Sequence, residues 1–381
     1  MSVTSAPLPP HVLHVTQPVD GGVARVVADL VRGQLAAGMR VSVACPAAGN
    51  LPRLLDSGCE VLEWQASRSP GKGLIREGRR LADVVARTRP DLVHAHSAKA
   101  GLITRLVVRG RVPTVFQPHA WSFEAVQGAA ARMALHWERF GARWTSRLVC
   151  VSRAEQETGR GHGIDAPWRL VPNGVDLERF HPARSSETVP HARGEGPLVV
   201  CVGRLCRQKG QDVLVRAWQD VLRELPGARL VLVGDGPDAA RLRAAAPRSV
   251  SFAGAVDDPV PWYRAADLVV MPSRWEGIAL APLEAMACGS PVLVTDVAGA
   301  RESLPSSLAR TCVVPPEDAT ALARALVSLL RAPEGLRALG RDAYRHVHAH
   351  HDVRRTAEAV AEVYGELLGL ETTAHREPIT T

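Results

Sequence analysis

The 381-residue sequence has few of the features that mark membrane, secreted or zinc-binding proteins. It has no apolar run of about 18 residues, and its first residues lack a charged segment followed by an apolar one. Neither a membrane span nor a secretory signal is therefore predicted. Its seven cysteines are scattered and form no Cys-x-x-Cys pair, which indicates a reduced, cytoplasmic protein without structural zinc.

Lysine is also scarce, and the positive charge is unevenly spread. Only three of the 46 basic residues are lysines, namely Lys72, Lys99 and Lys209. Residues 1–185 hold 24 Lys and Arg against 15 Asp and Glu, a balance of +9, whereas residues 186–381 hold 22 against 24, a balance of −2. A basic first half predicts attraction to a phosphorylated substrate, an anionic membrane surface or nucleic acid. The first candidates for a membrane contact are Arg105, Arg109 and Arg111, which cluster after Lys99.

Short apolar runs alternate with segments of helical periodicity along most of the chain. Strands are predicted at 11–16, 40–45, 60–64, 91–96, 113–117, 147–151 and 169–171, and again at 198–203, 229–233, 250–253, 268–271, 291–295 and 311–314. Helices are predicted at 74–88, 125–146, 152–161, 317–331, 334–348 and 352–369. This alternation predicts an α/β protein with two Rossmann-like domains, residues 1–182 and 198–351, joined by a turn-rich linker at 183–197. The polar tail 371–381 is predicted to be disordered.

The most informative stretch runs from Ser273 to Gly289 and contains Glu276 and Glu284. Glu276 follows the strand 268–271, and Glu284 is predicted about two turns into the next helix. Ligands of parallel sheets bind outside the carboxyl ends of the strands, and amides at a helix start are suited to phosphate or sugar hydroxyls. Two carboxylates flanking such a helix start suit a ligand that carries both phosphate and hydroxyl groups.

This pair of glutamates, with seven residues between them and Ala-Cys-Gly-Ser-Pro following, resembles the signature of the family 4 retaining glycosyltransferases. The run Pro-Asn-Gly-Val-Asp at 172–176 resembles the end of that family's first domain. The run His-Ser-Ala-Lys-Ala-Gly at 96–101 resembles members that build bacterial surface polysaccharides. The resemblance covers roughly residues 11–369.

The resemblance implies the GT-B fold, in which two Rossmann-like domains face each other across a cleft and a C-terminal helix, here 352–370, crosses back to the first domain. It implies retaining transfer of a sugar from a UDP- or GDP-sugar to an acceptor hydroxyl. Four residues match catalytic positions: Glu276 and His119 at the donor sugar, and Arg204 and Lys209 at the diphosphate. Glu284 matches the position that holds the ribose. The other predicted substrate-binding residues are Gly21, Gly22, Asn173, Gly234, Val256, Gly277, Ile278, Ala279 and Leu280.

No metal or other cofactor is predicted, since the nucleotide sugar is itself a substrate. The metal-dependent single-domain glycosyltransferases are disfavoured because the sequence has no Asp-x-Asp. His94 and His96 resemble metal ligands, but we expect the two rings to face opposite sides of their strand and therefore not to share an ion.

The expected partners are a nucleotide-sugar donor, a glycan or lipid-linked acceptor and an anionic membrane surface, without nucleic acid. These partners place the protein in the cytoplasm, at the inner face of the cell membrane. Two alternatives remain at this point: a nucleotide-sugar epimerase, and a non-catalytic module that binds nucleotide sugars.

Overall fold

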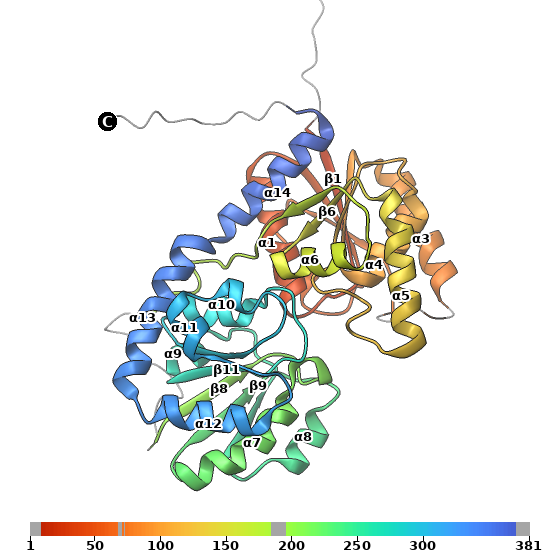
Figure 1. Ribbon diagram of the computed structural model, residues 1–381. Coiled ribbons are helices and arrows are strands. Elements are labelled where there is room, and N and C mark those ends of the chain that lie inside the picture. The colour runs from red at the N-terminus through yellow and green to blue at the C-terminus, as the bar shows by residue number, and fades with distance from the viewer. Residues whose placement is uncertain (1–8, 68–70, 72, 184–195, 371–381) are drawn as a thin grey trace, which may run out of the picture.

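The structure is a computed structural model that describes residues 9–67, 71, 73–183 and 196–370. Most of the predicted linker and the whole predicted tail 371–381 lie outside these residues. The described chain forms two parallel sheets, each covered by helices on both faces (Figure 1). The predicted α/β class with two Rossmann-like domains is confirmed.

The first sheet has seven parallel strands in the order β3-β2-β1-β4-β5-β6-β7. Its strands are β1 His11–Thr16, β2 Arg40–Cys45, β3 Glu60–Glu63, β4 Leu92–His96, β5 Thr114–Gln117, β6 Arg147–Cys150 and β7 Trp168–Leu170. Strands covered on both faces read as continuous apolar runs, and every residue of β1, β4 and β5 is buried. The order of the strands reverses between β1 and β4, which places a ligand crevice at their carboxyl ends.

Helices of the first domain connect these strands on either side of the sheet. They are α1 Gly22–Ala36, α2 Leu51–Leu54, α3 Leu74–Thr88, α4 Ser97–Val108, α5 Gly128–Gly141 and α6 Arg153–Gly161, with a short 3-10 turn, η1, at Ala142–Trp144. The predicted helix 125–146 is thus shorter at both ends. It begins after Gln127, whose backbone is extended, and ends in the 3-10 turn.

The second sheet has six parallel strands in the order β10-β9-β8-β11-β12-β13, with the reversal between β8 and β11. Its strands are β8 Leu198–Val202, β9 Arg229–Val233, β10 Val250–Gly254, β11 Leu268–Met271, β12 Val292–Thr295 and β13 Val313–Val314. The predicted strand 311–314 is reduced to two residues because Thr311 ends a helix.

Helices of the second half are α7 Gln211–Glu224, α8 Ala239–Ala245, α9 Val260–Ala265, α10 Leu280–Ala287, α11 Ser306–Thr311, α12 Ala319–Leu330, α13 Pro333–His350 and α14 Val353–Leu368, with 3-10 turns η2 Arg207–Lys209 and η3 Arg301–Ser303. None of the helices in the described ranges is both long and apolar enough to cross a membrane.

The last helix, α14, leaves the second domain and packs against α1 of the first (Figure 1). Tyr364 on its inner side is fully buried. On its outer side, Arg147 and Arg169 of the first sheet form ion pairs with Glu366 and Glu362. Together these contacts attach the end of the chain to the first domain.

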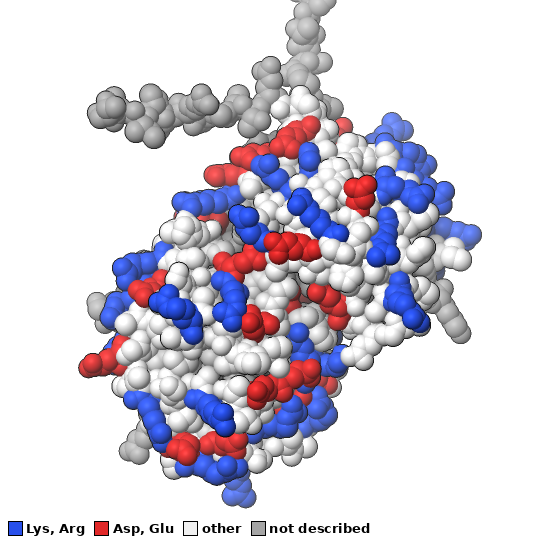
Figure 2. Space-filling view, viewed as in Figure 1, with Lys and Arg blue, Asp and Glu red and all other residues white. Residues whose placement is uncertain are grey.

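The basic excess of the first half lies on its outer surface. Figure 2 shows basic side chains gathered over the side of the first domain that carries α3 and α5, whereas both signs alternate over the second domain. Arg109 and Arg111 are exposed, but Arg105 is completely buried, and its guanidinium pairs with Glu138 at 2.7 Å. The prediction that Arg105 contributes to a membrane contact is therefore wrong: it faces inward on α4 and supports the packing of α5.

Candidate active site

Glu276 lies in the loop between β11 and α10, where two neighbouring groups hold its carboxylate. The Nζ atom of Lys209 lies 2.6 Å from Glu276 Oε1, and the hydroxyl of Ser273 donates to the same oxygen at 2.8 Å. The Glu276 side chain is 12% exposed and that of Lys209 20% exposed. Two of the predicted residues thus form an ion pair that is largely shielded from bulk water, which strengthens their interaction.

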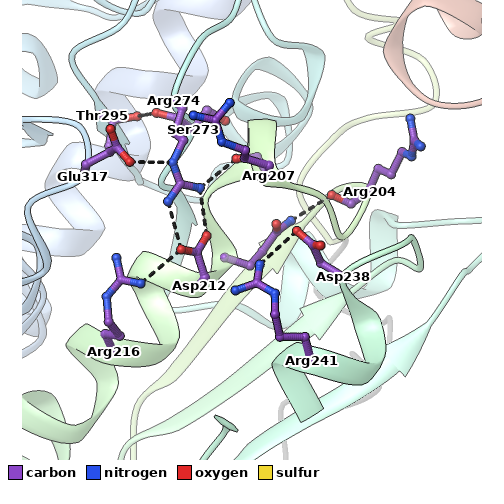
Figure 3. A network of polar contacts seen from close by, with 11 residues as sticks. Arg204, Arg207, Asp212, Arg216, Asp238, Arg241, Ser273, Arg274, Thr295 and Glu317 are labelled. Atoms are coloured by element: carbon purple, nitrogen blue, oxygen red, sulfur yellow. Dashed lines mark hydrogen bonds and ion pairs between the residues drawn. The ribbon is translucent and has the colours of Figure 1, made fainter. Parts of the chain in front are cut away.

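The loop itself is fixed by Arg274, the neighbour of Ser273 (Figure 3). Its guanidinium forms two bonds of 2.8 Å to the carboxylate of Asp212 and a third to Glu317. Hydrogen bonds from Arg274 hold the pKa of Asp212 down at about 2, so this carboxylate stays ionised. The sequence predicted neither the pair nor its role, because Asp212 lies 62 residues away.

A glycine is required where the two loops meet. Gly210 has a φ of +65°, and a β-carbon there would lie 2.0 Å from the carbonyl oxygen of Pro272. Any side chain would separate the Lys209 turn from the loop that carries Glu276. The close backbone approach therefore keeps Lys209 and Glu276 within contact distance.

Arg204 lies in the same strand-to-helix turn as Lys209 but points elsewhere. Its carbonyl accepts a hydrogen bond from the Gln211 side chain at 3.0 Å, and its side chain is exposed. In Figure 3 its guanidinium extends away from the Arg274 network. The structure does not bring Arg204 into contact with Lys209 or Glu276.

Glu284 is 4% exposed and is bonded from both domains. The Tyr263 hydroxyl donates to Glu284 Oε2 at 2.7 Å, and Arg25 of α1 forms an ion pair with Oε1. Because α10 begins at Leu280, Glu284 lies about one turn into the helix, and the prediction of two turns is wrong. A small cavity of about 60 Å³, lined by Glu284, Arg25 and Leu280 among others, opens beside this pair.

His119 follows the carboxyl end of β5, an interior strand of the first sheet, and has an unusual backbone. Its φ is +59°, and that of Ala120 is +134°. Positive φ values in non-glycine residues are uncommon and concentrate at functional sites, where the surroundings hold them. His119 lies opposite Gly277: a β-carbon on Gly277 would be 3.4 Å from the His119 carbonyl group and 2.7 Å from Val151.

Glu155 stabilises the backbone turn at His119 and Ala120, and this role was not predicted from the sequence. It is fully buried, and its carboxylate accepts hydrogen bonds from the backbone of Val151 and Ala120. Its own carbonyl accepts from the Trp121 indole at 2.7 Å. Burial raises the pKa of Glu155 to about 7. No sequence signal identified it, because an isolated glutamate on a helix reads as a solvated residue.

The other predicted residues divide into those at the domain interface and those inside the second domain. Asn173 donates to the carbonyl of Ile278 at 2.7 Å, and Gly22 lies against the Leu280 side chain. Gly21, the residue before α1 with φ +76°, and Ala279, the N-cap of α10, are the sequence neighbours of these contacting residues.

Within the second domain, Gly234 lies close to Gly203, where a β-carbon would meet a carbonyl oxygen at 2.1 Å. Val256 packs against the buried cluster of Leu198, Val200 and Val233. The site therefore draws on the carboxyl-end loops of both sheets.

The expectation for the histidines of β4 is wrong. His94 and His96 point to the same side of the strand, with ring centroids 4.0 Å apart, because residues two apart on a strand share a face. One nitrogen of each lies within 4.8 Å of a nitrogen of His14 on β1. All three rings are completely buried.

Arg25 and Tyr263 were also missed. Arg25 occupies the first turn of α1, three residues after Gly22, so a basic residue near a predicted anion-binding turn was the available signal. Tyr263 gave none, because it reaches Glu284 only through the packing of α9 on α10.

Two facing Rossmann-like domains, with charged side chains at the carboxyl ends of the second sheet, define the GT-B class of glycosyltransferases. Residues 20–179 match the family described as Glycosyltransferase Family 4, and residues 196–332 match Glycosyl transferases group 1. The chain belongs to the family 4 glycosyltransferases. It is accordingly a hexosyltransferase that acts on nucleotide sugars, which confirms the predicted class of enzyme.

Named relatives and a solved structure agree with this assignment. The lipopolysaccharide core biosynthesis mannosyltransferase LpcC of Rhizobium leguminosarum is 37% identical over 60% of this chain and 67% of its own length. D-inositol 3-phosphate glycosyltransferase 2 of Catenulispora acidiphila is 30% identical over 90% of both chains. The Anabaena protein Alr3699/HepE, solved in complex with UDP-glucose, has the same fold with a TM-score of 0.79 and 22% identity, over 93% of this chain and 99% of its own.

Proposed function

We propose that this enzyme moves a sugar from a nucleotide diphosphosugar to an acceptor hydroxyl with retained anomeric configuration. The observation that carries the proposal is the Lys209–Glu276 pair at the head of α10. Lys209 supplies a fixed cation for the diphosphate, and Glu276 supplies a carboxylate for the sugar hydroxyls. Arg204, exposed in the same strand-to-helix turn, gives the diphosphate a second cation.

In the proposed reaction the bond between the anomeric carbon and the diphosphate oxygen breaks, and a bond to the acceptor oxygen forms. The nucleoside diphosphate leaves with the electron pair, and the acceptor proton passes to a phosphate oxygen on the same face. Retention then requires no covalent intermediate. This fits Glu276, whose Oε1 already accepts from Lys209 and Ser273 and is better suited to orienting the sugar than to attacking it.

The donor-binding roles follow from position. Glu284 holds the ribose, and His119 completes the sugar pocket from the first domain, facing Gly277. The interface residues Gly21, Gly22, Asn173, Ile278, Ala279 and Leu280 surround the donor together with Gly234 and Val256. The donor is a UDP- or GDP-sugar: one relative is named a mannosyltransferase, and one fold neighbour was solved with UDP-glucose.

The acceptor is proposed to be an anionic glycan or glycolipid of the cell surface. One relative is named for an inositol phosphate and another for the lipopolysaccharide core. The first domain presents exposed arginines on α3, on α5 and on the turn η1 that follows α5, namely Arg76, Arg79, Arg80, Arg132, Arg139 and Arg143. Among them lie Ile75 and Met133, which are 72% and 74% exposed. This α3–α5 surface combines basic and apolar groups, and both kinds of group are needed for a protein to bind an anionic membrane surface.

The decisive experiment is a screen of UDP- and GDP-sugars by thermal shift, followed by product analysis with the donor that stabilises most. A glycoside plus free nucleoside diphosphate supports the proposal, and an α-linked product from an α-linked donor supports retention. An epimerised nucleotide sugar would instead identify an epimerase. Binding without turnover or donor hydrolysis would identify a non-catalytic module.

A further inference from the structure

Four histidines lie in a row behind the candidate sugar pocket: His14, His94 and His96 are completely buried, and His119 is partly buried at the pocket end. His14 Nδ1 lies 2.9 Å from His96 Nε2, and His96 Nδ1 lies 3.1 Å from His119 Nε2. The rings of each bonded pair are nearly parallel, with interplanar angles of 16° and 26° and ring centroids 5.2 and 5.4 Å apart. This orientation suits N–H···N bonds in the ring plane, so the row is a hydrogen-bonded chain.

The chain ends at Gln34 of α1 and Tyr364 of α14. His14 Nε2 lies 2.8 Å from Gln34 Oε1, and the Gln34 amide nitrogen donates to the Tyr364 hydroxyl at 3.3 Å. The Tyr364 oxygen lies 2.6 Å from Nδ1 of His94. Since the Tyr364 oxygen accepts a hydrogen bond from the Gln34 amide, the Tyr364 hydroxyl donates its own proton to Nδ1 of His94.

All four rings are neutral near pH 7. Burial lowers the pKa of His14 to about 4 and that of His119 to about 3, and it lowers the pKa values of His94 and His96 well below the usual range. A neutral imidazole carries one proton, so one nitrogen donates and the other accepts. The bond made by one nitrogen therefore decides the role of the other.

The direction of the chain follows from its end. Gln34 Oε1 can only accept, so His14 donates from Nε2 and accepts at Nδ1. His96 must then donate from Nε2 and accept at Nδ1, which requires His119 to donate from Nε2. The remaining nitrogen of His119, Nδ1, is left without a proton.

We propose that Tyr364 and Gln34 act as positioning residues that fix the tautomer of His119 through His14 and His96. His119 then presents a hydrogen-bond acceptor, Nδ1, to a hydroxyl of the donor sugar. This inference rests on the proposed function for the identity of the ligand, but the tautomer is a property of the protein alone. It also gives the crossing helix α14 a direct connection to the pocket.

A metal ion held by His14, His94 and His96 is the competing explanation, since their nitrogens lie within 4.8 Å of one another. Two observations oppose it. His14 and His96 already share a proton, and no acidic group contributes to the pKa shifts of the three rings. A buried divalent charge would therefore lack a compensating carboxylate.

The test uses ¹⁵N-histidine-labelled protein, in which protonated and unprotonated ring nitrogens resonate far apart. Signals of His119 are assigned from a His119→Asn spectrum. We expect His119 to carry its proton on Nε2. In Tyr364→Phe and Gln34→Met the amide no longer sets the direction, so His119 should shift toward a mixture of tautomers. The matched control Tyr344→Phe, on α13, should leave His119 unchanged.

Turnover gives the second measurement. Loss of one correctly oriented hydrogen bond should lower kcat/KM for the donor about three- to tenfold in Tyr364→Phe. A proton on Nδ1 of His119 in the wild type would overturn the proposal, as would unchanged His119 signals in both variants. Near-stoichiometric zinc in the purified protein would favour the metal site instead. Because the spectra need no substrate, failure to transfer sugar would count against the proposed function alone.

Discussion

Arg25 of α1 and Glu284 of α10 form an ion pair that joins the two domains at the cleft. Tyr263 donates to the other oxygen of the same carboxylate. Glu284 is therefore held in one orientation by a group from each domain. A ribose that binds there meets a preorganised acceptor, which reduces the entropy cost of binding.

Glu284→Ala should weaken binding of the free nucleotide. Hydrogen bonds to a charged group contribute about 1.5–3 kcal/mol, so the Kd should rise about tenfold to a hundredfold. Titration calorimetry with UDP and GDP measures this effect. Tyr263→Phe, which keeps the carboxylate, is the control and should have a smaller effect. An unchanged Kd in Glu284→Ala would remove the ribose role.

Glu276→Gln should keep nucleotide binding but lower turnover about a hundredfold or more, because the charge acts mainly in the transition state. The amide still offers an acceptor to Lys209 and Ser273, so the loop should hold its shape. Steady-state kinetics with the best donor provides the measurement. Glu317→Gln, which lies between β13 and α12 and contacts the same loop only through Arg274, is the matched control and should remain near wild type. Normal turnover in Glu276→Gln would reject the assignment.

Activity should survive EDTA. Lys209 and Arg204 are proposed to neutralise the diphosphate where other glycosyltransferases use a divalent ion. Initial rates are compared before and after chelation and then with added Mg²⁺ or Mn²⁺. Complete loss on chelation with recovery on adding metal would show that the two cations do not suffice.

The α3–α5 surface should bind anionic vesicles in a salt-dependent way. Each basic group near an anionic leaflet contributes about 1 kcal/mol, and the attraction fades over a Debye length of about 10 Å at 0.1 M salt. Reversal of Arg76, Arg79 and Arg132 to Glu should therefore abolish co-sedimentation. The matched control reverses three exposed arginines of the second domain, Arg248, Arg310 and Arg324, and should still bind. If the wild-type protein does not co-sediment with anionic vesicles at low salt, the membrane contact is excluded.

Stability should fall as the pH drops from about 6.5 toward 4. The buried histidines have folded pKa values below the unfolded value of 6.5, so the unfolded chain binds more protons in this range. His14 alone, with a pKa of about 4, corresponds to about 3 kcal/mol of stability lost by pH 4.

Glu155 and Asp29 act in the opposite sense, because burial raises their pKa values to about 7 and about 6. The four-histidine row should outweigh these two acids. Urea unfolding between pH 4 and 8 measures the slope, and His14→Gln should flatten it. A free energy of unfolding that stays constant down to pH 4 would contradict neutral, buried rings.

The positions of most strands and helices were predictable from the sequence, because apolar residues recur with different periods in buried parallel strands and in amphipathic helices. The glutamate signature and the strand-to-helix turn with Lys209 were visible for the same reason: each lies within one continuous segment. The Arg25–Glu284 pair was not predictable, since its partners lie 259 residues apart. Arg105 was misread because composition cannot tell an exposed arginine from one buried beside Glu138.

The histidine row was missed for a different reason. The period of the strand already required His94 and His96 to share a face, and the prediction failed by misapplying that rule. Their connection to His14 and Tyr364 depends on which strands and helices are neighbours. These neighbours are known only once the strand order of the first sheet and the packing of α14 against the first domain are known.

The return of α14 means that the chain passes between the two domains twice, and the passage into α14 is bonded to the end of the first domain. Val175 donates to the carbonyl of His351 and accepts from the amide of Val353, and a β-carbon on Gly174 would lie 2.6 Å from the backbone of Val353. The end of the first domain and the start of α14 are therefore bonded to each other through their backbones. We expect any rotation of one domain against the other to turn about this contact, because it bonds the start of α14 directly to the end of the first domain.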